Sequence, residues 1–149
     1  MSTTASKDLT KEAPRSPRIR IGGYVILGRT IDKCRALLAG KIGDYHFDCP
    51  LDNYLFGFKG VNGPDFKAEI EKGATDEAMA RWLDSHGTPK TPEEIKQWSD
   101  GVEAHSFVTD PERKDFFIDV CTKLGIDPYK SSVFDWLEAD DKASYAKYR

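Results

Sequence analysis

The sequence lacks long hydrophobic runs, so it contains no segment that could cross a membrane. Even its longest apolar stretches are short, for example residues 24–27. A membrane-spanning helix needs about 20 predominantly apolar residues. Residues 1–11 are polar and contain no hydrophobic segment of the kind that a secretory signal requires. We therefore expect a soluble cytoplasmic protein without a membrane partner.

Cysteine pairs and the motifs of common enzymes are also missing. Cys34, Cys49 and Cys121 are odd in number and widely spaced, which predicts reduced thiols rather than disulfides or a structural zinc ion. The sequence has no glycine-rich phosphate-binding loop, no His-Glu-x-x-His zinc motif and no Gly-x-Ser-x-Gly elbow. It thus predicts no metal site, and it leaves any cofactor unknown.

Charge is unevenly distributed, although the formal net charge is only −3. Residues 1–41 contain nine Lys or Arg residues and three Asp or Glu residues. Residues 42–149 contain thirteen Lys or Arg residues and twenty-two Asp or Glu residues. A basic N-terminal third could face nucleic acid or another anion, or it could pack against the acidic remainder of its own chain. We favour the second explanation, because no lysines cluster near Trp82, Trp98 or Trp136 to support nucleic-acid binding.

The residues that are present predict one mainly α, compact, multi-helix domain. A chain of 149 residues with 39% hydrophobic residues can bury a single core. Apolar residues at spacings of three and four, N-cap residues and terminal glycines predict helices over 24–39, 64–72, 75–86, 110–125 and 132–140, with another that begins at 91. We expect residues 1–12 to be flexible and residues 13–149 to form the helical domain.

Residues 44–58 form an exception, and we expect a small irregular or β-hairpin element there. The segment is rich in aromatic residues and alternates loosely between polar and apolar positions. Pro50 and Gly57 interrupt it, which is typical of a turn or a loop.

Several blocks of the sequence carry a family pattern: Pro14–Leu38, Tyr45–Phe47, Cys49–Asp52, Thr91–Ile95 with Trp98, and Phe134–Asp141. Together they resemble a bacterial family known as DUF5069, over nearly the whole chain. The resemblance implies no activity, cofactor or catalytic residue, because the function of that family is unknown.

The aromatic segment is the strongest candidate for a site. His46, Asp48 and Cys49 are candidate catalytic groups that could act as acid, base or nucleophile. Candidate ligand-binding residues in the same segment are Tyr45, Asp52 and Tyr54. The alternative is a buried aromatic loop whose polar atoms are hydrogen-bonded and in which Cys49 is a small apolar filler.

A second candidate is the proline-rich arm formed by residues 13–20. Arg15, Arg18 and Arg20 could bind an anion together with the free N–H groups of a following helix. We favour the alternative that these arginines pair with the acidic part of the domain. Asp32, within the first predicted helix, is a candidate acid or base, although most aspartates within helices are solvated or paired.

These observations slightly favour a small-molecule binding protein, in particular for an anionic ligand, or a small enzyme. The site would lie between the Arg15–Asp32 region and the Tyr45–Tyr54 loop, because reactive side chains are concentrated there. The alternative is a non-enzymatic interaction or structural module that forms a homodimer or larger homo-oligomer. A closed pocket would favour ligand binding, whereas a flat exposed aromatic patch would favour assembly.

Overall fold

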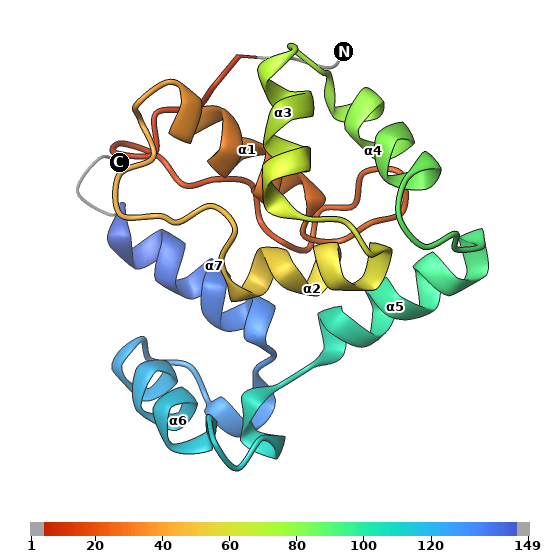
Figure 1. Cartoon of the computed structure of the whole chain (residues 1–149). Helices are drawn as coiled ribbons and strands as arrows, with labels where there is room; N and C mark the ends of the chain where they lie inside the picture. The colour runs from red at the N-terminus through yellow and green to blue at the C-terminus, as the bar shows by residue number, and fades with distance from the viewer. Residues whose placement is uncertain (1–4, 146–149) are drawn as a thin grey trace.

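The computed structural model describes residues 5–145, and this part of the chain is mainly helical, as the sequence predicts (Figure 1). Its α-helices are α1 (Leu27–Leu38), α2 (Pro50–Lys59), α3 (Gly63–Glu71), α4 (Asp76–Ser85), α5 (Pro92–Ala104), α6 (Lys114–Lys123) and α7 (Val133–Ser144). Two short 3-10 helices, η1 (Phe107–Thr109) and η2 (Pro128–Lys130), flank α6. Within residues 5–145 the only β-pairing is an isolated bridge between Ile21 and Tyr24.

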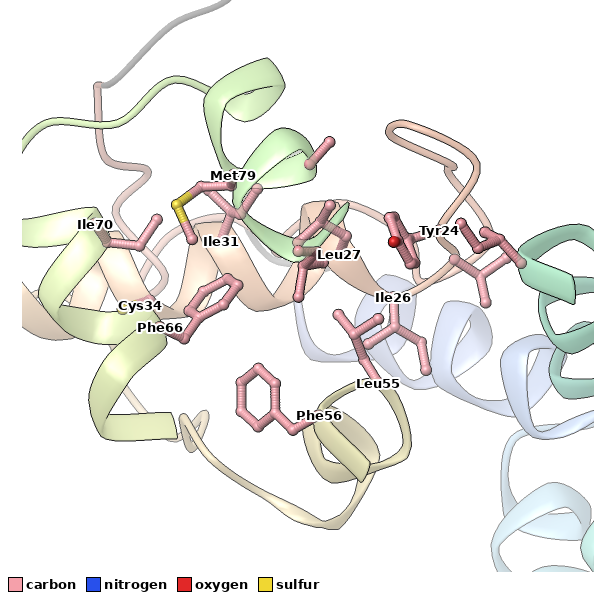
Figure 2. Packing of buried hydrophobic residues seen from close by; sticks show 14 of the residues in the cluster. Tyr24, Ile26, Leu27, Ile31, Cys34, Leu55, Phe56, Phe66, Ile70 and Met79 are labelled. Atoms are coloured by element: carbon pink, nitrogen blue, oxygen red, sulfur yellow. The ribbon is translucent and has the colours of Figure 1, made fainter. Parts of the chain in front are cut away.

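Helix α1 is the central element, and it contacts α2, α3 and α4. Its apolar face, which includes Leu27 and Ile31, packs against Phe56 of α2, Phe66 of α3 and Met79 of α4 (Figure 2). The helix is buried on its other faces as well, from Leu27 to Ala36. The charged residues on those faces must therefore find partners inside the protein.

Of the irregular or β-hairpin element predicted for residues 44–58, the hairpin is absent and residues 44–49 are irregular, whereas residues 50–59 form α2. Pro50 is not a strand breaker here but the first residue of a helix, a position that its fixed φ suits. Asp52, Leu55, Phe56 and Lys59 are buried at spacings of three and four, which is the period of a helix. The aromatic residues hid this period, since exposed Tyr54 looks as apolar in sequence as buried Phe56.

Two predicted helices begin later than the sequence suggested. Tyr24 exchanges backbone hydrogen bonds with Ile21 in a tight turn, so α1 begins only at Leu27. Asp110 caps a turn by accepting from the Glu112 N–H, and α6 begins at Lys114. By contrast, α5 begins at its predicted capping box, in which Thr91 and Glu94 exchange hydrogen bonds.

The N-terminal segment, which consists of the proline-rich arm and the residues before it from Leu9, lies beside α7 although the two are far apart in sequence. Ser16 donates to Glu138, and the Tyr145 hydroxyl donates to the Leu9 carbonyl. The flexible segment predicted for residues 1–12 falls partly outside the described residues, but Leu9 is buried and its N–H donates to the Lys41 carbonyl. The arm therefore forms part of the domain from Leu9 onward.

A smaller hydrophobic core joins η1, α6 and the start of α7. It contains Phe107, Phe117, Cys121 and Val133. We call η1, α6 and η2 the small lobe. In Figure 1 the small lobe lies below α7, at the end of the molecule opposite α3. None of the helices within residues 5–145 combines the length and the apolar character needed to span a bilayer.

Candidate functional site

The candidate site contains two cations that lie one helical turn apart on α1. The side chains of Arg29 and Lys33 are only 4% and 3% exposed. Arg29 forms a two-pronged ion pair with Asp141 of α7, with N–O distances of 2.7 and 3.1 Å. Burial by itself would lower the pKa of Arg29, but hydrogen bonds and charge from Asp141 raise it above its ordinary value. Arg29 is therefore a permanent cation.

Lys33 is held by Asp52, which is fully buried at the start of α2. The ammonium nitrogen lies 2.9 Å from Asp52 Oδ1. The same carboxylate accepts from the Thr30 hydroxyl at 2.7 Å and from the backbone N–H groups of Asp48 at 2.9 Å and Cys49 at 3.4 Å. Asp52 thus fixes both the lysine and the loop before α2.

Cys49 is the N-cap residue of α2, and its sulfur accepts a hydrogen bond from Lys33 Nζ at 3.2 Å. Its side chain is half-buried, unlike those of Cys34 and Cys121, which are buried. Burial raises the pKa of the Cys34 thiol to about 12 and also raises the pKa of Cys121. Within residues 5–145, Cys49 is therefore the accessible cysteine.

These groups open onto a cavity of about 610 Å³ between α1, the α1–α2 loop and α7. Its charged and reactive lining consists of Arg29, Lys33, Asp44, Tyr45, His46, Cys49 and Asp140. The rest of the lining consists of Leu9, Thr10, Gly43, Leu51, Trp136, Leu137, Ser144 and Tyr145. In Figure 1 the α1–α2 loop runs beside α7, and the cavity lies along this boundary.

Tyr45 attaches the loop to α7. Its hydroxyl donates to Asp141 at 2.7 Å, and the guanidinium of Arg29 lies 5.4 Å from its ring centroid. Its ring stacks on Tyr145, with the planes 3° from parallel. Burial, and then the hydrogen bond to Asp141, raises the pKa of Tyr45, so the phenol remains a neutral donor.

Carboxylates at the surface contribute the opposite charge. Asp44 and Asp140 are exposed and line the same cavity as the two buried cations. Desolvation and the nearby charge of Asp141 raise the pKa of Asp140 above its ordinary value. The cavity thus has two ion-paired cations on its buried wall and carboxylates on its exposed side.

The structure brings only some of the predicted site residues to this cavity. Tyr45, His46 and Cys49 line it, and Asp52 lies directly behind Lys33. Asp48 is exposed with a φ of 63° and accepts a hydrogen bond from the Asn53 amide. The exposed Tyr54 hydroxyl accepts from Arg113, away from the cavity lining.

The arginines of the arm lie elsewhere, in ion pairs with the domain. Arg15 binds Asp32 and Asp76, with N–O distances of 3.1 and 2.8 Å. Asp32, the candidate acid or base on α1, is occupied by this contact and by the Arg15 backbone N–H. Two further arginines tie the arm to α5 and α7: Arg18 pairs with Asp135 and Glu138, and Arg20 pairs with Asp100 and Glu103.

Arg29, Lys33, Trp136 and Asp140 were not among the predicted site residues. A signal for the first two exists in the sequence, because positions 29 and 33 share one face of a helix. Nothing local predicts the contribution of α7, which reaches the cavity through tertiary packing. Within residues 5–145, no three His, Cys, Asp or Glu side chains are grouped so that they could hold a metal ion.

The family described as "Domain of unknown function (DUF5069)" matches the sequence over residues 11–143. The chain belongs to the DUF5069 family. The matched DUF5069 region includes both cavity cations, the α1–α2 loop and Cys49, whereas Leu9, Thr10, Ser144 and Tyr145 of the lining lie outside it. No curated protein matches the chain. Membership of DUF5069 therefore brings no activity with it.

Proposed function

We propose that this DUF5069 protein binds a small molecule through an anionic group. The observation that carries the proposal is the position of Arg29 and Lys33, two buried and fixed cations on the wall of one cavity. A volume of about 610 Å³ is in the range of small-molecule sites.

The two cations have donors to spare for a ligand. An ammonium has three N–H donors and a guanidinium five. Lys33 uses one for Asp52 and one for Cys49, and Arg29 uses two for Asp141 and one for the Arg15 carbonyl. Asp52 accepts from three groups besides Lys33, so sharing the ammonium with a ligand does not leave that carboxylate unpaired.

The polarity of the cavity supports one orientation of the ligand. An anionic group fits the buried wall, where charge-assisted hydrogen bonds are strongest. The apolar surface of Leu51, Trp136 and Leu137 suits a hydrocarbon or aromatic body. Asp44 and Asp140, at the exposed side, suit hydrogen-bond donors at the other end of the molecule.

The alternative function, an interaction or structural module, has its own support. Phe116 of α6 and Tyr129 of η2 are 53% and 65% exposed on the small lobe. Both lie outside the cavity lining, so a homodimer formed through this lobe would leave the cavity open. A concentration-dependent melting temperature that responds to Phe116→Ser would favour assembly through this face.

Ligand binding is tested with two probes of the same shape and different charge, benzoate and benzamide. Saturation-transfer NMR on the full chain should detect benzoate more strongly, because only benzoate brings a negative charge to Lys33 and Arg29. Lys33→Met should weaken benzoate binding about tenfold or more, the cost of a hydrogen bond to a charged group.

The matched control is Lys96→Met, which removes the same charge from an exposed lysine paired with Asp100. It should leave benzoate binding unchanged. Equal binding of benzoate and benzamide, or equal weakening by both substitutions, would contradict the proposal.

A further inference from the structure

The cavity carries one thiol, that of Cys49, and its sulfur is in direct contact with a cation. Sγ accepts from Lys33 Nζ at 3.2 Å, and both side chains line the cavity. The cysteine is half-buried and lines the cavity, so a bound molecule can reach its exposed part. This is the environment of reactive thiols, which lie beside a cation and remain partly exposed.

Lys33 is fixed in a position that supports negative charge on sulfur. Asp52 and the buried wall of α1 hold the ammonium, so it does not have to be reorganised when charge develops at Sγ. The N-terminus of α2 adds a further favourable field at its N-cap residue. The same ammonium retains a donor for an anionic ligand, which would place that ligand next to the sulfur.

We propose that Cys49 is the nucleophile of this site and attacks an electrophilic carbon of the anionic ligand, an inference that rests on the proposed function. The sulfur supplies the electron pair of the new S–C bond. The bond from that carbon to its leaving group breaks, and the leaving group departs with the bonding pair. The thiol proton passes to solvent, and Lys33 is a positioning residue that also binds the anion.

Two alkylating reagents of nearly the same size test the inference on the full chain: iodoacetate, which is anionic, and iodoacetamide, which is neutral. Both alkylate thiolates with loss of iodide, and mass spectrometry of peptides gives the rate at each cysteine. Cys49 should react at least about tenfold faster than the buried Cys34 and Cys121. All three should react in urea.

The decisive measurement is the ratio of the iodoacetate rate to the iodoacetamide rate. At Cys49 this ratio should exceed that of N-acetylcysteine amide, an uncharged free thiol, by about tenfold, because Lys33 and Arg29 attract the carboxylate. Lys33→Met should return the ratio to the value of the free thiol, whereas Lys96→Met should leave it unchanged. A purely structural role of Lys33 would alter both rates and not their ratio.

The outcomes separate this inference from the proposed function. Slow alkylation of native Cys49 by both reagents would contradict the proposal that Cys49 is the nucleophile, even if benzoate binds. Fast alkylation without a preference for iodoacetate would support Cys49 as a nucleophile but contradict the proposal that the site binds an anionic ligand. If Lys33→Met does not fold, Lys33→Met/Asp52→Asn removes both charges of the pair and permits the same comparison.

Discussion

Asp141 illustrates how a single residue can stabilise the fold and form the site. It is buried, and it accepts two hydrogen bonds from Arg29 and one from Tyr45. A buried ion pair contributes little net stability relative to apolar packing, but the loss of one partner leaves the other charge uncompensated. Arg29 would then be an unpaired cation inside the protein.

Asp141→Ala should therefore lower the free energy of unfolding by about 3–5 kcal/mol. Urea denaturation of the full chain measures this change. The control is Asp119→Ala, which breaks the exposed pair with Lys123 and should cost less than about 1 kcal/mol. A similar loss from both substitutions would show that Arg29 does not depend on Asp141.

At the scale of elements, backbone geometry determines which of two glycines can be replaced by alanine. Gly101 lies within α5, and a methyl group added there would meet no atom within 4 Å. Gly87 follows α4 with a φ of +66°, and a methyl group would fall 1.9 Å from the Lys59 carbonyl oxygen. The first position tolerates alanine and the second requires glycine.

Gly101→Ala should raise the free energy of unfolding by about 0.5–1 kcal/mol, because alanine loses less conformational freedom in a helix. Gly87→Ala should lower it by at least about 2 kcal/mol, because the backbone of Lys59 must move. Thermal and urea unfolding of the two variants provide the comparison. A loss of stability in Gly101→Ala would mean that α5 is not a regular helix at that position.

The elements also show what could be predicted from the sequence. Local signals predicted the start of α5, because Thr91, Pro92 and Glu94 determine it within four residues. The same signals were present at α2, where Cys49 takes the N-cap position and Pro50 follows, but cysteine is not a usual N-cap residue.

The candidate site was predictable in part. Tyr45, His46 and Cys49 stood out because reactive groups are dense in one short segment. The buried cations of α1 did not, because their burial depends on Asp52 and Asp141 from other helices. The arm was predicted to pair with the acidic remainder, and its arginines do form ion pairs with carboxylates of the domain.

At the scale of the whole molecule, Arg15 links the arm to α1 and α4 through Asp32 and Asp76. Burial by itself would raise the pKa of Asp76, but hydrogen bonds and charge from Arg15, with a contribution from Arg35, lower it below its ordinary value of 3.8. A carboxyl group whose pKa is depressed by folding stabilises the protein above its unfolded pKa. That contribution is lost as the pH falls through the folded value.

The free energy of unfolding should therefore fall as the pH is lowered from about 5 to below 3.8, where Asp76 loses its charge. Arg15→Met should be less stable near neutral pH and should lose less stability on acidification. Urea denaturation across this range tests the slope, with Lys123→Met as a control that should keep it. An unchanged slope in Arg15→Met would mean that other carboxylates dominate acid unfolding.

The closure of the cavity by α7 has a consequence for the order of folding. Arg29 and Asp141 are 112 residues apart, and the Tyr145 hydroxyl reaches back 136 residues to Leu9. During synthesis the N-terminal part of a chain is available first, and contacts between distant segments form late because their loops are costly to close. The cavity can then close only after α7 has been synthesised, so we expect the pairing of Arg29 with Asp141 to form late in folding.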